Sequence, residues 1–571
     1  MATASMRDEA ASSMPGSFRE LKGRQLAIAL TGVMLGLLLS ALDQTIVGTA
    51  MPRIIADLGG LEHYAWVATA YLLASTAAVP IFGKLSDIYG RKWFYIGGMI
   101  LFMIASALCG LSQSMLQLIL FRGLQGIAGG ILMANAFAII GDLFPPAERG
   151  KWQGLMGGVF GLASVVGPSL GGWLTDGPGW RWVFYVNLPV GVLAIAVLLY
   201  GLPAIRPHEP RPIDWLGAAT IVGMTVPLLL AFSWGGNAYA WSSPRVTGLL
   251  LLSVIMAAVF LIAEQRAEEP MIPLRFFRNR VFTVSVCSMF LIGAGMFGVV
   301  MYIPLFIQGV IGESATNSGA ILTPMMLSMV ASSTISGQII SRTGRYKWAA
   351  FGGLVVMAMG MWLLSRMDGD TGRATTIRNM IVLGLGTGMT MPTFTLAVQN
   401  SFPARELGVV TAGVQFFRSI GSTIGVALMG TLLTSNLKDG LRADLPADVS
   451  AALPPDALDD LNAQALASPE AQALLQSQFA QLSNGAQLFS DLMASMRDSL
   501  ATAIQEVFII ATAVAVVAAG ISTFLSEAPL RTRHEGAGAI EAGKELAATG
   551  AAGTVLAPAE HEPRLTPARP K

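Results

Sequence analysis

The sequence alternates between long apolar runs and short charged loops. The runs are about 20 residues each, the length that an α-helix needs to cross about 30 Å of hydrocarbon. Hydrophobic residues make up 53% of the 571 residues and charged residues only 12%, whereas soluble domains carry about 25% charged residues. A membrane β-barrel would show shorter segments of alternating polarity. The pattern therefore predicts an all-α integral membrane protein.

Fourteen runs are long enough to be transmembrane spans. Their approximate limits are 26–50, 64–82, 94–111, 115–140, 152–174, 183–202, 216–234, 246–263, 281–307, 319–340, 348–365, 377–398, 408–433 and 504–524. Between residues 84 and 407, loops after even-numbered spans carry fifteen Lys and Arg, and loops after odd-numbered spans carry five. Because basic loops stay in the cytoplasm, we predict a multi-pass protein of the cytoplasmic membrane with both termini inside.

The chain also repeats itself. A glycine-framed loop at 83–91 recurs 254 residues later at 337–345, and a second block at 144–167 recurs 258 residues later at 402–425. The first repeat connects the loop after span two with the loop after span ten, a shift of eight spans. Two six-helix halves separated by two inserted spans account for this shift. Transporters built from parallel halves bind substrate near the midplane between them.

The predicted organisation has five parts. They are a cytoplasmic N-terminal tail (1–25), an N-terminal six-helix half (26–203), two inserted spans (214–264), a C-terminal six-helix half (281–525) and a cytoplasmic tail (526–571). The C-terminal half contains an external segment, 435–502, whose Ala- and Leu-rich stretches predict short amphipathic helices on the outer surface. The tail has too little apolar content to fold, so we expect it to be disordered.

The most unusual residue in the apolar runs is Asp43. It follows seventeen uncharged residues, 26–42, and more apolar residues follow it up to Pro52. A carboxylate at that depth costs several kcal/mol unless a partner compensates it. Arg122 in span four and Asp43 in span one both lie roughly 10 to 12 Å from the outer face, at about 1.5 Å per residue. The two charges can therefore be partners.

Two interpretations of this pair remain open. If Asp43 is ionised, the pair with Arg122 is stabilised; a proton or a cationic substrate would loosen it and favour another arrangement of the halves. The alternative is a permanent buried ion pair that only fixes packing. The depth in the membrane and the small and polar residues on the facing helix stripes favour proton coupling.

The chain shows no signal for metal binding, catalysis or nucleic-acid binding. The four histidines lie in loops or tails without ligand spacing, and Cys109 and Cys287 lie inside apolar runs, where they are expected to be buried hydrophobes. No phosphate-binding Gly-x-x-x-x-Gly-Lys-Ser/Thr loop is present. We expect no enzymatic activity, no metal and no cofactor beyond a proton gradient. The expected partners are a small-molecule substrate, protons and membrane lipids, in a monomeric protein.

Two stretches are candidates for conformational gating. Their residues are Gly83, Asp87, Gly90, Arg91, Gly167, Pro168 and Arg345. Asp87 can pair with Arg91 or cap a neighbouring helix N-terminus, and so hold one conformation closed on the cytoplasmic side. In the second half Ser341 replaces the acid and only the basic side, with Arg345, remains. Gly167-Pro168 removes a backbone donor in mid-span and bends the helix, which a plain packing kink would also explain.

Polar, aromatic and Met side chains of the core spans are candidates for an adaptable pocket, because such surfaces repack around varied ligands. They are Gln44, Thr45, Trp66, Tyr71, Gln125, Met133, Asn135, Phe137, Met296, Phe297, Tyr302, Met325 and Arg418. Ordinary core packing explains most of the aromatic and Met residues equally well. No acidic residue of a second-half span is an obvious partner for Arg418, which can meet another helix's carboxylate, backbone carbonyls or substrate.

Four stretches resemble a known family. The loop 83–92, GKLSDIYGRK, resembles the signature loop of the major facilitator superfamily. Residues 42–52, LDQTIVGTAMP, resemble the first-span motif of its fourteen-span drug:proton antiporters, with Gly48 and Thr49 where that family usually has Asn and Val. Residues 122–126, RGLQG, are similar to the fourth-span arginine motif. A Gly-rich stretch centred on Gly167-Pro168, followed by WRWVFYVNLP from Trp180, is similar to the fifth-span antiporter motif and the next loop.

The resemblance covers residues 25–525 and implies a major facilitator fold with 14 transmembrane helices. It also implies a proton-coupled secondary antiporter that exports amphipathic or cationic drugs across the cytoplasmic membrane by alternating access. One alternative is an exporter of an endogenous lipid, siderophore or secondary metabolite. An alternative from a different class is a non-transporting membrane sensor.

Overall fold

The computed structural model describes residues 21, 23–59, 64–204, 212–236, 238–312, 315–369, 371–403, 406–446, 449, 476–477, 479 and 484–530. Most of the predicted N-terminal tail, most of segment 435–502 and the chain after residue 530 lie outside the described residues. The predictions of amphipathic surface helices and of a disordered tail therefore fall largely outside what the structure describes.

The described residues form a bundle of long helices. The first half contains α2 (Arg24–Leu58), α3 (Tyr64–Tyr89), α4 (Arg91–Leu111), α5 (Met115–Leu143), α6 (Pro146–Asp176), α7 (Trp182–Tyr185) and α8 (Asn187–Gly201). The inserted pair is α9 (Trp215–Trp234) and α10 (Pro244–Arg266). The second half contains η3 (Leu274–Arg278), α11 (Arg280–Leu305), η4 (Phe306–Val310), α12 (Ala315–Thr343), α13 (Lys347–Leu364), α14 (Arg373–Ser401), α15 (Leu407–Asp444) and α20 (Gly485–Ser522).

A helix covers each of the fourteen predicted spans, and the all-α fold class is confirmed. Within the described chain, thirteen helices are long and apolar enough to cross a membrane. The fourteenth, α12, is 29 residues long but rich in Ser and Thr. Its hydroxyls bond to backbone carbonyls, as Ser328 does to Met325 and to Ile381 of α14. Hydroxyls bonded in this way are satisfied inside the bundle, so α12 needs less hydropathy than a lipid-facing helix.

Several helices run beyond the predicted span limits, three of them by eight residues or more. The helix that carries Asp43 continues past residue 50 to Leu58, and α15 continues past residue 433 to Asp444. Helix α20 begins at Gly485, well inside the predicted external segment 435–502. The extensions of α15 and α20 pack together: a Cβ on Gly440 would lie 3.3 Å from the Cβ of Ser499. Hydropathy marks only the part of a helix that lies in lipid. It does not predict how far a helix continues beyond the lipid when another helix packs against it.

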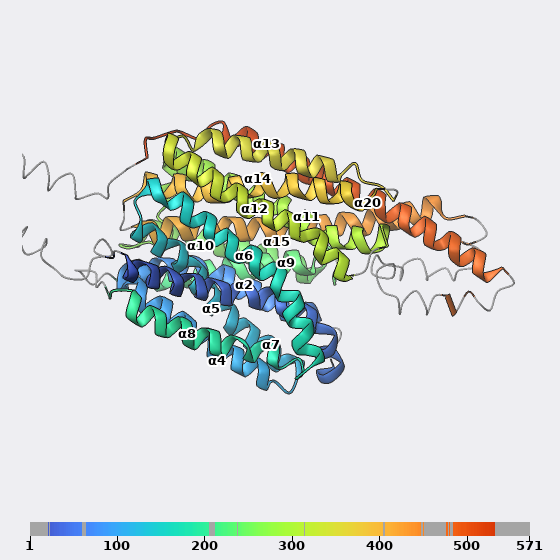
Figure 1. The fold of residues 1–571 in the computed structure, drawn as a ribbon, viewed down its shortest axis with the longest axis horizontal. Coiled ribbons are helices and arrows are strands. Elements are labelled where there is room, and N and C mark those ends of the chain that lie inside the picture. The colour runs from blue at the N-terminus through green and yellow to red at the C-terminus, as the bar shows by residue number, and fades with distance from the viewer. Residues whose placement is uncertain are drawn as a thin grey trace, which may run out of the picture.

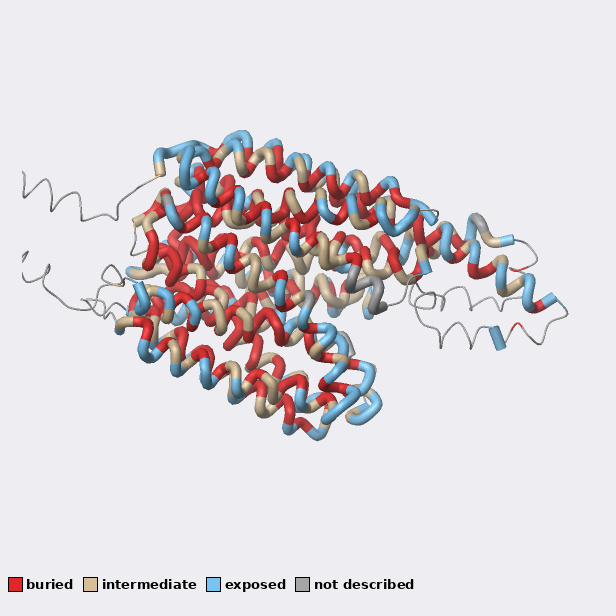
Figure 2. Tube along the Cα trace, viewed as in Figure 1, coloured by how far each residue is buried: buried red, intermediate tan, exposed pale blue. Residues whose placement is uncertain are grey.

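The start of α2 and the end of α20 lie at the same end of the bundle, at the left of Figure 1. We call this end the termini side and the opposite end the loop side. From the termini side the two halves slope apart toward the loop side (Figure 1). Buried residues follow the sides of the helices that face one another, while exposed residues follow the outer sides (Figure 2).

The two halves meet mainly along two helix pairs, α3 with α15 and α6 with α12, with smaller contacts of α5 with α15 and of α6 with α14. Glycines make the second contact close: a Cβ on Gly150 would lie 2.9 Å from the Cα of Gly337, and one on Gly154 would lie 3.1 Å from the Cα of Thr334. Farther along α6, Gly161 lies against Val330. We call this contact of Gly150, Gly154 and Gly161 with α12 the glycine seam. About 22 Å of α6 separates the start of the helix from Gly161, so the glycine seam occupies the termini-side half of α6.

The inserted helices lie beside the interface rather than apart from it. Helix α9 packs on α10 and also on α3 and α15, one helix from each half. Its last residue, Trp234, forms an edge-to-face pair with Trp66 of α3, with ring centroids 5.6 Å apart. After α10, Glu269 accepts a 2.7 Å ion pair from Lys84 of α3. The inserted pair therefore contacts both halves, and an ion pair joins the segment that follows it to the first half.

Two glycines show why the loop repeats. Gly90 precedes α4 with a φ of 99°, and Gly344, at the equivalent point before α13, has a φ of 71°. Residues with a Cβ rarely adopt this conformation, so glycine is favoured at both turns. The internal repeat in the sequence thus reflects a repeated helix–turn–helix geometry in the two halves.

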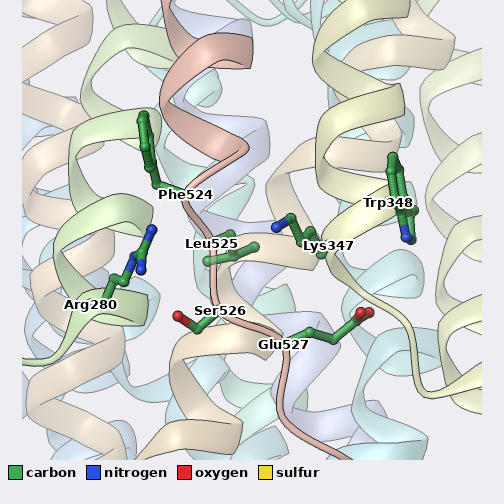
Figure 3. A pocket seen from close by; sticks show the side chains of 7 residues that line it. All are labelled: Arg280, Lys347, Trp348, Phe524, Leu525, Ser526 and Glu527. Atoms are coloured by element: carbon green, nitrogen blue, oxygen red, sulfur yellow. The ribbon is translucent and has the colours of Figure 1, made fainter.

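On the termini side, the segment after α20 lies against Tyr346, the residue before α13. The Tyr346 hydroxyl donates to the carbonyl of Ser526 at 2.9 Å and accepts the N–H of Ala528 at 2.9 Å. Burial raises the pKa of the Tyr346 phenol above its usual range, so it stays protonated for the first bond. A small cavity of about 340 Å³ lies beside this segment, where Arg280 and Lys347 point toward it from α11 and α13 (Figure 3).

Candidate functional site

Asp43 and Arg122 form an ion pair inside the first half. Arg122 Nη1 donates to Asp43 Oδ2 at 2.5 Å, and the side chains are 3% and 0% exposed. Asp43 comes from α2 and Arg122 from α5, which run in opposite directions, so their matching depth follows from their positions along the two helices. The sequence argument placed both charges at one level, and the structure brings them into contact.

Three neutral side chains complete a network around the carboxylate. Gln125 Nε2 and Asn187 Nδ2 both donate to Asp43 Oδ1, at 2.9 and 3.1 Å. Gln125 also accepts from Arg122 at 2.7 Å. Ser106 Oγ accepts from the Gln125 and Asn187 amides at 3.2 and 3.0 Å. The ionised carboxylate therefore receives three donors, which offset the loss of water around a buried charge.

The Arg122 guanidinium also makes contacts with α3. Arg122 Nε donates to the carbonyl of Val67 at 3.3 Å, and its guanidinium carbon lies 4.5 Å from the ring centroid of Tyr71. The Tyr71 hydroxyl lies 3.0 Å from Ser40 Oγ on α2. Tyr71 was predicted to line the substrate pocket, but it is 2% exposed and supports the ion pair instead. A cation over an aromatic face is favourable in a desolvated site.

Asn187 is the direct donor to Asp43 that the sequence argument missed. It begins α8, directly after the break at Val186 that separates α7 from α8. This break turns the Asn187 side chain into the bundle, where it is 1% exposed. The signal was present in the WRWVFYVNLP stretch, in which Asn187 is the polar residue between two apolar stretches. Nothing in the local pattern indicated which helix it would face.

A second cluster joins the two halves on the termini side. Asp87, near the end of α3, accepts the backbone N–H groups of Gly408 and Val409 at 3.2 and 2.9 Å. These groups lie in the first turn of α15, where a carboxylate is stabilised by free donors and by the helix dipole. Arg91 forms an ion pair with Asp87 and another with Asp142, the latter at 2.7 Å. We call these side chains and the start of α15 the latch.

Glycine permits the close approach at the latch. A Cβ on Gly83 would lie 2.5 Å from the Cβ of Ala412 on α15. The equivalent second-half residue Arg345 is exposed, and its backbone N–H bonds to Thr343. Arg345 thus lies outside the latch: the structure brings together the first-half gating candidates of this loop and leaves the second-half one apart.

Further hydrogen bonds join the halves beside the latch. Gln399 of α14 pairs with Gln153 of α6 at 3.1 Å and donates to the carbonyl of Phe137 on α5 at 3.4 Å. Arg149 donates to the Gln399 carbonyl at 3.3 Å. The Phe137 backbone, rather than its predicted ring, thus takes part in an interface contact. Together with the latch, these bonds close the termini side between the halves.

The Gly167-Pro168 stretch lies against the helix that carries Asp43. Thr45 Oγ1 donates to the carbonyl of Ala163 on α6 at 3.0 Å, and a Cβ on Gly167 would collide with that hydroxyl. Pro168 lies inside α6. Thr45, a predicted pocket residue, is thus engaged in helix packing one turn or less from Asp43.

The remaining pocket candidates form two groups: side chains that are buried or hydrogen-bonded within the bundle, and side chains that are exposed or partly exposed. Met296 and Met325 are 8% and 1% exposed inside the core of the second half, where they pack as ordinary apolar residues. The Tyr302 hydroxyl donates to the carbonyl of Val426 at 3.0 Å. The Asn135 amide donates along its own helix at 2.9 Å. Gln44 is exposed, and Trp66, Met133 and Phe297 are partly exposed.

A model of the Major Facilitator Superfamily matches residues 33–426. The chain belongs to this superfamily. Its relatives include the multidrug transporter protein MdtP of Bacillus subtilis (strain 168), 47% identical over 417 residues, 73% of this chain and 77% of MdtP. Multidrug resistance protein 3 of the same organism is 39% identical over 505 residues, 88% of this chain and 96% of that protein. The efflux pump dotC of Dothistroma septosporum is 36% identical over 419 residues, 72% of each chain.

The solved structures agree on the fold. The crystal structure of the human organic anion transporter MFSD10 (TETRAN) superposes with a TM-score of 0.56, covering 86% of this chain and all of that one at 15% identity. At that identity the likeness shows the fold alone. The family model and the transporters among the relatives show that this major facilitator protein is a multi-pass membrane transporter for small molecules, not an enzyme.

Removing one donor from Asp43 is expected to weaken transport without abolishing it. The change Asn187→Ala deletes one of the three hydrogen bonds to the ionised carboxylate. A bond to a charged group contributes about 1.5 to 3 kcal/mol, so transport should fall about ten- to a hundredfold. Dye export from vesicles would measure this. Asn187→Gln, which keeps the amide, should retain more activity than Asn187→Ala; equal loss in both would indicate a packing role instead.

Proposed function

We propose that this major facilitator protein is a proton-coupled antiporter that exports amphipathic or cationic drugs across the cytoplasmic membrane by alternating access. The termini side is then cytoplasmic, as the basic loops favour. The observation that carries the proposal is the buried network around Asp43, an ionisable group deep in a membrane-spanning helix. Such groups commonly mark proton relays. The multidrug transporters and efflux pumps among the relatives support the drug class.

The network suits a carboxylate that changes protonation. With Asp43 ionised, the amides of Gln125 and Asn187 turn their N–H groups toward it. The Asn187 Oδ1 has no hydrogen-bond partner among the described residues. If Asp43 takes up a proton, the Asn187 amide can rotate and accept the new O–H. Both protonation states can therefore be satisfied by the same side chains, which a permanent ion pair would not require.

A packing route connects Asp43 to the interface between the halves. Asp43 and Thr45 lie two residues apart on α2, and Thr45 bonds to α6 at Ala163. Helix α6 is one side of the glycine seam with α12. Protonation of Asp43 releases its attraction to Arg122 and allows α2 to shift against α5, which moves the α6 surface that contacts the second half. In our proposal this shift favours opening of the seam and the latch.

The test is export of a fluorescent drug from proteoliposomes with an imposed proton gradient. Rhodamine 123, an amphipathic monocation, serves as the probe. Transport should follow the gradient, and collapsing it with an ionophore should stop concentrative export. Concentrative export that continues unchanged without the gradient would show that protons do not drive it.

A further inference from the structure

Arg418 is a buried cation in the second half. It lies in α15, eleven residues after Leu407, and is 7% exposed. At about 1.5 Å per residue this is about 16 Å from the start of the helix. Gln415 and Ser422 lie on the same stripe, and Ser422 donates to the Arg418 carbonyl at 2.9 Å. Arg418 therefore lies deep in the membrane on a polar stripe of an interface helix.

The Arg418 guanidinium uses only part of its hydrogen-bonding capacity. Its Nε donates to Gln415 Oε1 at 2.8 Å, and its guanidinium carbon lies 5.8 Å from the ring centroid of Phe297 on α11. Within the described residues, Nη1 and Nη2 have no hydrogen-bond partner and no carboxylate lies within 4 Å. The other buried guanidiniums are better satisfied: Arg122 and Arg91 pair with carboxylates, and Arg149 donates to two backbone carbonyls.

The charges of the membrane core do not balance without a ligand. Asp43 and Arg122 cancel one another, which leaves Arg418 as an uncompensated positive charge. Burying such a charge costs several kcal/mol, and proteins normally retain it only where it has a partner in some functional state. Two free guanidinium nitrogens form a planar fork that matches the two oxygens of a carboxylate.

We propose that Arg418 binds the carboxylate of an amphipathic substrate, with the Phe297 ring against the apolar part next to it. The substrate range then includes zwitterions and organic acids as well as cations. The inference rests on the proposed function, because it assigns a subsite of the same transport route. An inorganic anion such as chloride has the same charge and could occupy the site, and the experiment separates the two.

Two dyes that differ at one group provide the test. Rhodamine 110 carries a free carboxylate, and rhodamine 123 is its methyl ester. We expect Arg418→Gln to lower both binding and export of rhodamine 110 about ten- to a hundredfold, as for loss of a bond to a charged group, and to change binding and export of rhodamine 123 less than twofold. Arg418→Lys keeps the charge and should retain part of the rhodamine 110 activity. Arg373→Gln, an exposed arginine at the start of α14, is the control.

Several outcomes would overturn the inference. If both dyes lose export equally in Arg418→Gln, or if this variant melts well below wild type, Arg418 has a structural role, since no carboxylate depends on it here. If replacing chloride by gluconate changes wild-type melting and rhodamine 123 export but leaves Arg418→Gln unaffected, the ligand is inorganic. Dye binding, followed by fluorescence anisotropy in detergent, needs no gradient. Carboxylate-selective binding without gradient-driven export would therefore contradict the proposed function and leave the anion subsite intact.

Discussion

Asp43→Asn is expected to abolish gradient-driven export while the protein still binds dye. Asparagine has nearly the shape of aspartate but cannot carry a proton, so the coupling step is lost and concentrative export should fall at least about a hundredfold, which corresponds to about 2.7 kcal/mol. The same change leaves Arg122 without its carboxylate. Breaking a buried ion pair on one side costs about 3 to 5 kcal/mol, so lower thermal stability is expected too.

The measurement is rhodamine 123 export from proteoliposomes at matched protein content, together with dye binding in detergent. Asp57→Asn is the matched control, since Asp57 lies on the same helix but is half exposed and pairs with Arg181 on the loop side. If Asp43→Asn does not fold, the double change Asp43→Asn with Arg122→Gln removes both charges and restores balance. Gradient-driven export in a folded variant without the acid would show that Asp43 is not the coupling group.

Asp87→Asn is expected to open the termini side. It weakens the acceptor for two N–H groups of α15 and removes the ion pair with Arg91, while Arg91 keeps Asp142 and the local fold persists. Losing about 2 kcal/mol of charge-assisted bonding shifts the equilibrium between open and closed states about thirtyfold. Export should fall because the closed state is reached less often.

Double electron–electron resonance between spin labels can measure this shift between the open and closed states directly. Lys151 on α6 and Arg342 on α12 are exposed on the termini side of opposite halves, so spin labels there, with Cys287→Ser, report the separation of the halves. Asp87→Asn should increase the population of long distances, and Asp176→Asn on the loop side should not. A distance distribution identical to that of the parent would contradict the latch.

The ion pair was predictable because a helix has a fixed rise. Residue counts from the ends of two antiparallel spans place Asp43 and Arg122 at one depth, and a buried charge needs a partner. The latch was predictable only in outline. The loop showed an acid before a basic cluster, but the N–H groups that Asp87 caps lie 321 and 322 residues away along the chain.

The pocket candidates show where residue type stops being informative. Met296 and Met325 have the chemistry of an adaptable binding surface but pack in the core of the second half. Tyr71 supports Arg122, and Thr45 joins α2 to α6. Each choice depends on the rotation of a helix about its own axis. That rotation is set by contacts with several other helices, which hydropathy and spacing do not encode.

The sequence by itself determined the class of protein, the spans and the presence of two repeated halves. Each of these follows from local physics: a polar backbone in lipid must form helices, a span needs about 20 apolar residues, and a turn with positive φ favours glycine. The tertiary structure decided which polar groups meet. Asn187 completing the Asp43 network, Asp87 reaching the start of α15, and Arg418 lacking a carboxylate partner among the described residues all arise from packing between distant segments. Such packing minimises unpaired buried polar groups over the whole bundle, so no single stretch of sequence can specify it.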